Sequence, residues 1–204
     1  MKFIGTIQQV QIQRTPLKIG EKPNKVYDVT PIMVVDALRL TPSGGVGLTA
    51  DGGEFLDTHH IQHPQSRNRR NANGISIGFM SNYRQMRQRF GDHLFDGSAG
   101  ENIIVDAVPD FSPDDLTSGL LIETPAGSVQ LCNIKPAAPC DAFSRYCANR
   151  QVGGEELKAI LQFLSDGMRG YYATLAPTEA GMLTVSTGDK IYALSATNDD
   201  LTGA

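Results

Sequence analysis

The sequence contains no tryptophan, only three cysteines and no long run of apolar residues. Because a membrane-spanning helix needs about 20 consecutive apolar residues, we expect no such helix. Three cysteines, an odd number in a chain of 204 residues, argue against a disulfide framework. Residues 1–5 also lack the apolar run of a secretory signal. These absences predict a soluble protein of a reducing compartment, with the cytoplasm as the expected location.

Strong charge of either sign is also missing. The chain has 18 basic and 22 acidic residues, which gives a formal net charge of −4 at pH 7. A mildly acidic chain has no electrostatic reason to bind nucleic acid or an anionic membrane surface. We therefore expect neither as a partner and look for a small-molecule ligand instead.

Glycine and proline are frequent, at 21 and 11 residues. Such punctuation is typical of many short strands and turns rather than long helices. No internal repeat or low-complexity linker divides the chain. We predict one mainly β (α+β) domain over residues 1–196, a partly closed β-barrel decorated with a few short helices, followed by a flexible tail at residues 197–204.

Hydrophobic periodicity places the elements of this domain. Ser81 is the predicted N-cap of a helix that ends at Gly91, and a second helix is predicted over residues 155–165. Residues 32–35 suggest a strand buried on both faces, residues 43–47 a flexible turn, and residues 57–73 an irregular loop. Strands are predicted over residues 3–13, 27–40, 75–79, 101–106, 120–124, 128–134, 171–175, 183–186 and 190–194.

Cys140 is the strongest candidate for chemistry. Residues 136–139 include two prolines that stiffen the approach to it, and residues 141–146 can begin a short helix. A thiol at a helix N-terminus meets unpaired N–H groups and the positive dipole end, which stabilise the thiolate. A thiolate attacks electrophiles, carries sulfur or binds a soft metal. A buried structural cysteine is the equally weighted alternative.

The other two cysteines are weaker candidates. Cys132 lies within a predicted strand, where packing is its expected role. Cys140 and Cys147 would be about 10 Å apart along a continuous helix, beyond the roughly 7 Å that a disulfide allows. A break in the helix would permit the pair, so a role for Cys147 as a resolving cysteine stays open.

His59 and His63 are candidate metal ligands. Their i, i+4 spacing puts two imidazoles on one turn of a helix, and Asp57 could add an oxygen ligand. However, Pro64 follows at once and helix signals are absent. We therefore favour a structural or substrate-orienting role over a metal.

Two further segments offer polar contacts to a ligand. Arg67, with Arg69 and Arg70, could clamp a phosphate or carboxylate, although a solvated loop explains these arginines equally well. Arg169 stands between two glycines and could contact an anion in the same way.

Gly100, Glu101 and Asn102 lie where a turn meets a strand. A glycine lets backbone N–H groups approach an anion closely, and the two polar side chains could orient a ligand. The pattern is not that of a phosphate-binding loop. It therefore indicates a binding role only in combination with other motifs.

Taken together, these motifs resemble the MOSC domain family, named after the C-terminal domain of molybdenum cofactor sulfurases. The likeness runs from residue 30 to residue 194, and the order and spacing of its motifs make it specific. The motifs are Asp57-Thr58-His59-His60 through Ser66-Arg67, Gly100-Glu101-Asn102-Ile103, Pro139-Cys140 with Phe143, Arg169-Gly170-Tyr171, and Gly188-Asp189-Lys190-Ile191.

The resemblance implies a MOSC-type β-barrel and a cysteine, here Cys140, that handles sulfur or ligates molybdenum in a pyranopterin cofactor. Some relatives reduce N-hydroxylated substrates such as amidoximes, and others are predicted sulfur carriers. Many members place an arginine near the position of Ala137 and Ala138. Contacts to the phosphate of the cofactor are therefore expected from Arg67, Arg145 and Arg169.

Three hypotheses follow. The first is a MOSC protein that binds molybdenum cofactor through Cys140 and performs or assists a reduction, with electrons from a separate donor protein. The second is a metal-free sulfur carrier that holds a persulfide on Cys140, loaded by a separate desulfurase. The third is a barrel that binds a ligand or protein without chemistry.

We predict that Cys140 is the most reactive of the three thiols, because a helix N-terminus favours its thiolate. Limited alkylation at neutral pH, followed by peptide mapping, measures this order. Preferential labelling of Cys132 or Cys147 in cofactor-free protein would contradict the assignment.

Overall fold

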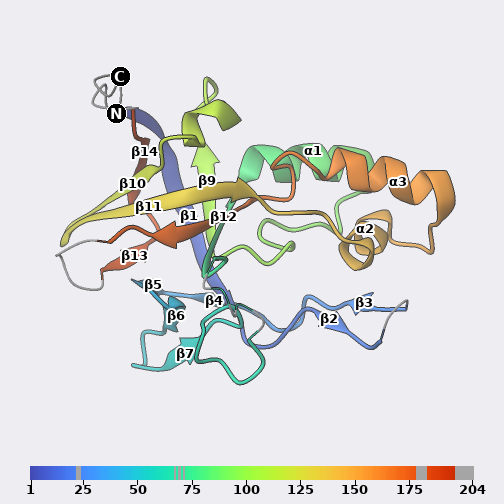
Figure 1. Cartoon of the computed structure of the whole chain (residues 1–204), viewed down its shortest axis with the longest axis horizontal. Helices are drawn as coiled ribbons and strands as arrows, with labels where there is room; N and C mark the ends of the chain where they lie inside the picture. The colour runs from blue at the N-terminus through green and yellow to red at the C-terminus, as the bar shows by residue number, and fades with distance from the viewer. Residues whose placement is uncertain (22–23, 67, 69, 71, 178–182, 196–204) are drawn as a thin grey trace, which may run out of the picture.

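The main sheet closes on itself to form a barrel. The structure is a computed structural model that describes residues 1–21, 24–66, 68, 70, 72–177 and 183–195, so the predicted tail lies outside it. Seven strands close the ring in the order β14-β10-β11-β12-β8-β9-β1, and β14 pairs with β1 (Figure 1). These strands are β1 (Lys2–Gln13), β8 (Ile75–Phe79), β9 (Ile103–Ala107), β10 (Leu120–Thr124), β11 (Gly127–Pro136), β12 (Tyr171–Leu175) and β14 (Lys190–Ala193).

The first strand, β1, is long enough to pair with three others. Its start pairs with β14, its middle with β9, and its end, from Val10 to Gln13, with β4 (Ile32–Val35). The neighbours in the ring are antiparallel except β8 and β9, which run parallel. Closure removes the exposed strand edges of an open sheet. The predicted barrel is therefore confirmed, and it is more fully closed than expected.

A smaller sheet lies beside the barrel (Figure 1). Its order is β13-β5-β6-β7, with bounds Thr184–Ser186, Ala37–Thr41, Gly44–Leu48 and Glu54–Leu56. A short ribbon of β2 (Lys18–Ile19) and β3 (Val26–Tyr27) extends from the same region.

Three α-helices lie together at one end of the molecule (Figure 1). They are α1 (Met80–Phe90), α2 (Asp141–Ala148) and α3 (Gly154–Phe163), and a 3₁₀ turn covers Pro113–Leu116. They enclose a second apolar cluster that includes Tyr83, Phe143 and Leu164. In the part of the chain that the structure describes, no helix has the length and apolar character to cross a membrane.

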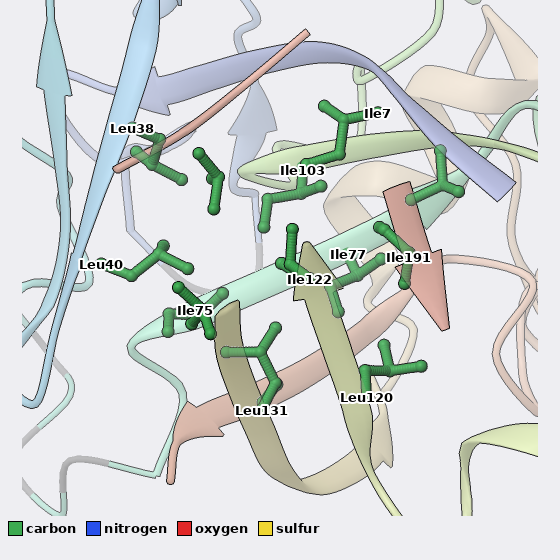
Figure 2. Packing of buried hydrophobic residues seen from close by; sticks show 14 of the residues in the cluster. Ile7, Leu38, Leu40, Ile75, Ile77, Ile103, Leu120, Ile122, Leu131 and Ile191 are labelled. Carbon is green, nitrogen blue, oxygen red and sulfur yellow. The ribbon is translucent and has the colours of Figure 1, made fainter. Parts of the chain in front are cut away.

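The barrel interior holds the main apolar core. It is built largely from isoleucine and leucine side chains such as Ile7, Ile77 and Ile122 (Figure 2). All five residues of β8 are buried, because Ile75, Ile77 and Phe79 point into the barrel while its other face is covered. Ser76, on that second face, lines the pocket described below. The strand therefore joins the core to the candidate site.

Several elements match the sequence predictions. The hairpin of β10 and β11, the end of α1 at Gly91 and a helix close to residues 155–165 are all confirmed. Within residues 27–40 the structure has β3, β4 and β5 in place of one strand. The short strands β2 and β7 were not predicted.

The predicted flexible turn at residues 43–47 is wrong. These glycines belong to β6, which pairs with β5 along its whole length. A Cβ on Gly47 would lie 2.9 Å from Cγ1 of Val35, and one on Gly45 would lie 3.2 Å from Cδ1 of Leu38. Gly47 therefore allows close packing against the main sheet, and Gly45 allows close packing against a side chain of the neighbouring strand β5.

Two other predictions also fail. Val34 is 60% exposed, so β4 is not buried on both faces. The reason is that β4 pairs with the end of β1 outside the closed ring. The N-cap of α1 is Phe79 rather than Ser81, since β8 passes directly into the helix without a connecting loop.

Truncation of Ile7 should destabilise the barrel. Ile7 is fully buried where β1 pairs with β9, so Ile7→Ala should lower the free energy of unfolding by about 2–5 kcal/mol. Urea unfolding measures the change, and Val34→Ala on the exposed end of the same sheet is the control, at less than about 0.5 kcal/mol. Similar losses in the two variants would contradict this account of the core.

Candidate functional site

A pocket of about 180 Å³ opens beside the barrel, between β8, β12, the turn before β9 and the segment that follows β1. The residues that line it include Gln13, Leu17, Lys18, Tyr27, Thr58, His59, Asn68, Asn73, Ser76, Gly100, Glu101, Ala137, Arg169, Tyr171 and Tyr172.

Two glycines make room for the carboxyl group of Glu101. A Cβ on Gly78 would lie 2.7 Å from Oε1 of Glu101, and one on Gly170 would lie 2.9 Å from the same atom. Gly170 also has a φ of +100°, which favours glycine. Larger residues at either position would therefore displace Glu101.

Glu101 is a buried acid that lacks a second hydrogen-bond partner. Its side chain is only 4% exposed, and the hydroxyl of Tyr83 donates to Oε2 at 2.5 Å. Oε1 has no partner among the described residues. Burial raises the pKa of Glu101 to about 7, although the Tyr83 bond and the charge of Arg169 oppose the rise. The group can therefore hold or release a proton near neutral pH.

Arg169 places a buried cation in the same wall. Its Nη1 donates to the carbonyl of Ala138 at 2.7 Å, and its guanidinium lies over the ring of Phe143. Burial would lower the pKa of Arg169, but Tyr172, Tyr27 and other acidic neighbours raise it above its ordinary value. Its Nε is buried without a partner in the described structure.

Tyr27 completes a set of unsatisfied polar atoms. Its buried hydroxyl makes no well-formed hydrogen bond in the part of the chain that is described. Burial raises its pKa well above the ordinary range, although the neighbouring Arg169 opposes the rise. Buried polar groups normally have hydrogen-bond partners. Glu101 offers an acceptor while Tyr27 and Arg169 offer donors, so a polar ligand with both kinds of group would satisfy them.

Asn102 does not line the pocket but holds neighbouring residues of the site in place. Its Oδ1 accepts from the backbone N–H and the hydroxyl of Ser76, each at 3.0 Å. Its Nδ2 donates to Oδ2 of Asp57 at 3.0 Å. In this geometry Asn102 holds Ser76 and Asp57 in place.

Asp57 and His59 form a hydrogen-bonded pair at the pocket. Nδ1 of His59 lies 3.0 Å from Oδ1 of Asp57. Burial would raise the pKa of Asp57, but the bonds and charge of His59 and the backbone N–H of Gln13 hold it below its ordinary value. His63 instead contacts the carbonyl of Arg14.

The two histidines therefore do not share a ligand. Among residues that the structure describes, no group of three or more histidine, cysteine, aspartate or glutamate side chains could hold a metal.

Cys140 occupies the predicted place at a helix start. It is the N-cap residue of α2, it is partly exposed, and its thiol is free. Cys140 does not line the pocket, whereas Tyr27 and Arg169 do. The charge of Cys140 contributes to the raised pKa of Tyr27 and to that of Arg169. Cys140 also packs against the apolar cluster that contains Tyr27, so the thiol lies near the pocket without lining it.

The other thiols sit in different surroundings. Cys147 is buried in the continuous helix α2, and burial raises its pKa to about 12. Cys132 lies in β11, where its sulfur is 3.4 Å from the hydroxyl of Thr174. Neither lines the pocket.

Arg145, a predicted phosphate contact, does not line the pocket. Arg145 lines a separate shallow hollow with Lys25, and its Nε donates to the carbonyl of Val152. Arg67 and Arg69 lie outside the described residues. Tyr27 and Asn68 line the pocket, and neither was singled out from the sequence because no local motif marks them.

Glu101 should make the stability of the protein depend on pH. A carboxyl group whose pKa is raised on folding contributes stability that is present at low pH and lost as pH rises through about 7. The free energy of unfolding, relative to that of Glu101→Gln, should fall by about 3 kcal/mol between about pH 4 and about pH 8. Urea unfolding across this range measures it, and a difference independent of pH would refute the buried-acid description.

No family model and no curated protein matches the chain. The crystal structure of the YuaD protein from Bacillus subtilis is 18% identical, with a TM-score of 0.55, and the match covers 94% of this chain and 96% of that one. A hypothetical protein is 16% identical, with a TM-score of 0.55 and coverage of 97% and 71%. YiiM from Geobacillus stearothermophilus is 14% identical, with a TM-score of 0.51 and coverage of 93% and 75%. At these identities the likeness shows the fold, which is a MOSC-type barrel.

Proposed function

We propose that this chain binds a pyranopterin molybdenum cofactor at the pocket and performs or assists the reduction of N-hydroxylated or related small molecules. Cys140 is the proposed thiolate ligand. The observation that carries the proposal is the set of unsatisfied buried atoms on Glu101, Tyr27 and Arg169, which surround one pocket beside Cys140. The MOSC-type fold is consistent with it.

The donor and acceptor pattern of the pocket suits this cofactor. The pterin ring carries N–H donors and a carbonyl acceptor on one edge, so Oε1 of Glu101 would accept while Tyr27 and Nε of Arg169 would donate. Its phosphate would lie near a cation, and Lys18 and Arg169 both line the pocket. The bound metal would supply two-electron exchange with the substrate.

The residues of the chain would set the conditions for that exchange. Cys140 would be held as a metal ligand at the start of α2, where it is the N-cap residue and where the positive end of the helix dipole lies. Glu101, with a pKa of about 7, can take up or release a proton in the same pocket. A separate electron-donor protein would deliver the electrons.

A metal-free sulfur carrier is the second candidate. One observation favours it: Cys140 is partly exposed and does not line the pocket. A thiol in this position can be reached by a desulfurase and can hold a persulfide for transfer to another acceptor.

Molybdenum content separates the two candidates. Protein from cells that make the cofactor should hold close to one molybdenum per chain, and Cys140→Ala should remove it because the thiolate ligand is lost. Elemental analysis after gentle purification measures this. Cys132→Ala is the matched control and should keep its molybdenum, since Cys132 lies away from the pocket.

Alkylation gives a second measure of the same question. Cofactor-loaded protein should resist alkylation at Cys140, while metal-free protein should react. Protein without molybdenum in every expression host, and with a persulfide on Cys140 by mass spectrometry, would establish the carrier instead. Molybdenum retained in full by Cys140→Ala would remove this role from the residue.

A further inference from the structure

The Asp57 carboxylate is a fully used acceptor. It is completely buried and receives N–H groups from three residues. The backbone of Gln13 donates to Oδ2 at 2.8 Å, the backbone of His59 to Oδ1 at 2.7 Å, and Nδ2 of Asn102 to Oδ2 at 3.0 Å. The fourth contact is the His59 ring. An anion held this way cannot turn, so it fixes the ring beside it.

This contact determines which nitrogen of His59 carries the proton. The pKa of Asp57 lies below its ordinary value, so the carboxyl group is ionised at neutral pH and can only accept. Nδ1 must therefore be the donor across the 3.0 Å contact. Nε2 is left for another partner, and no hydrogen bond within the described structure engages it.

His59 differs from the other histidines in this respect. All four histidines of the sequence lie in the described part of the chain. Nε2 of His60 lies 3.4 Å from the hydroxyl of Thr41, and that of His63 lies 3.1 Å from the carbonyl of Arg14. Nε2 of His93 faces the carbonyl of Tyr146. Only the His59 ring lines the pocket, where its side chain is 25% exposed.

The surroundings of His59 also point to a ligand. Glu101 and Arg169 line the same pocket, are each more than nine-tenths buried, and each have an unpartnered polar atom in the described structure. Tyr172 flanks the ring, with centroids 6.3 Å apart. An aligned imidazole and unsatisfied polar groups therefore face one space.

We propose that His59, aligned by Asp57, is the general acid that protonates the leaving oxygen of an N-hydroxylated substrate. This rests on the proposed reduction. Nε2 first takes up a proton from solvent, and the imidazolium ring that forms keeps its Nδ1–H on the Asp57 carboxylate. For an amidoxime the N–O bond then breaks, its electron pair leaves with the oxygen, and that oxygen takes the proton from Nε2 to leave as water. The nitrogen receives two electrons, in the two-electron exchange that the bound cofactor would supply, together with one proton from solvent, and the product is an amidine. A one-electron reductant acting twice would replace those electrons. Solvent reprotonates His59.

The closing experiment compares two substrates that differ only in their leaving group. Cofactor-loaded wild-type, His59→Gln and His63→Gln proteins reduce benzamidoxime and its O-acetyl ester, with reduced methyl viologen as the electron source. Hydroxide needs a proton to leave, whereas acetate does not. His59→Gln should therefore lose about 10²- to 10⁴-fold in kcat/KM on benzamidoxime, and far less on the ester.

The control variant lies on the same loop. His63→Gln removes an imidazole outside the pocket and should leave both rates close to wild type. Molybdenum content should be equal in all three proteins, because none of the changes removes Cys140. An equal loss by His59→Gln on both substrates, or no loss on either, would overturn the general-acid role.

A second measurement needs neither cofactor nor activity. In long-range ¹H–¹⁵N spectra of metal-free protein, neutral His59 should carry its proton on Nδ1, and His59→Gln identifies its signals. A proton on Nε2 would overturn the alignment by Asp57. Wild-type protein that holds molybdenum but reduces neither substrate would defeat the proposed reaction, and the spectra would still decide the alignment.

Discussion

The site depends on one buried anion, the carboxylate of Asp57. Its contacts join the end of β1 through Gln13, the turn before β9 through Asn102, and the loop that carries His59. Such an ion is stable in a low-dielectric interior only when hydrogen bonds replace its water. Removing one contact would leave a buried charge partly unsatisfied. The loop that begins at Asp57 is therefore held in place at its first residue, although the described residues between 57 and 73 form no helix or strand.

Glu101 shows the opposite use of burial. Asp57 is saturated with donors and stays ionised, whereas Glu101 has one donor from Tyr83 and an unpartnered Oε1 in the described structure. Two carboxyl groups at one pocket are thus set to different protonation states by the number of N–H and O–H groups around them. Unsatisfied buried groups cost folding free energy. Their persistence around a single pocket is understandable if a ligand satisfies them.

Much of the fold could be predicted, because periodicity and turn residues are local signals. The hairpin over residues 125–127, the helix stop at Gly91 and the helix start at Cys140 each depend on neighbours in sequence. The errors arise from distant contacts. Gly45 and Gly47 were predicted to form a turn. The structure instead needs glycine at both positions because Leu38 and Val35 pack closely against them. Tyr27 joins the pocket only through the fold, so no local pattern could indicate its role.

Arg169 links the predicted cysteine to the observed pocket. Its charge opposes the rise in the pKa of Glu101 and of Tyr27, and the charge of Cys140 contributes to its own raised pKa. One guanidinium therefore interacts with an acid that titrates near pH 7, a neutral phenol and a thiol. When Glu101 takes up a proton, one negative charge beside Arg169 is removed, so the field of the guanidinium is left for an anionic ligand. Proton uptake by Glu101 and anion binding in the pocket should thus favour each other.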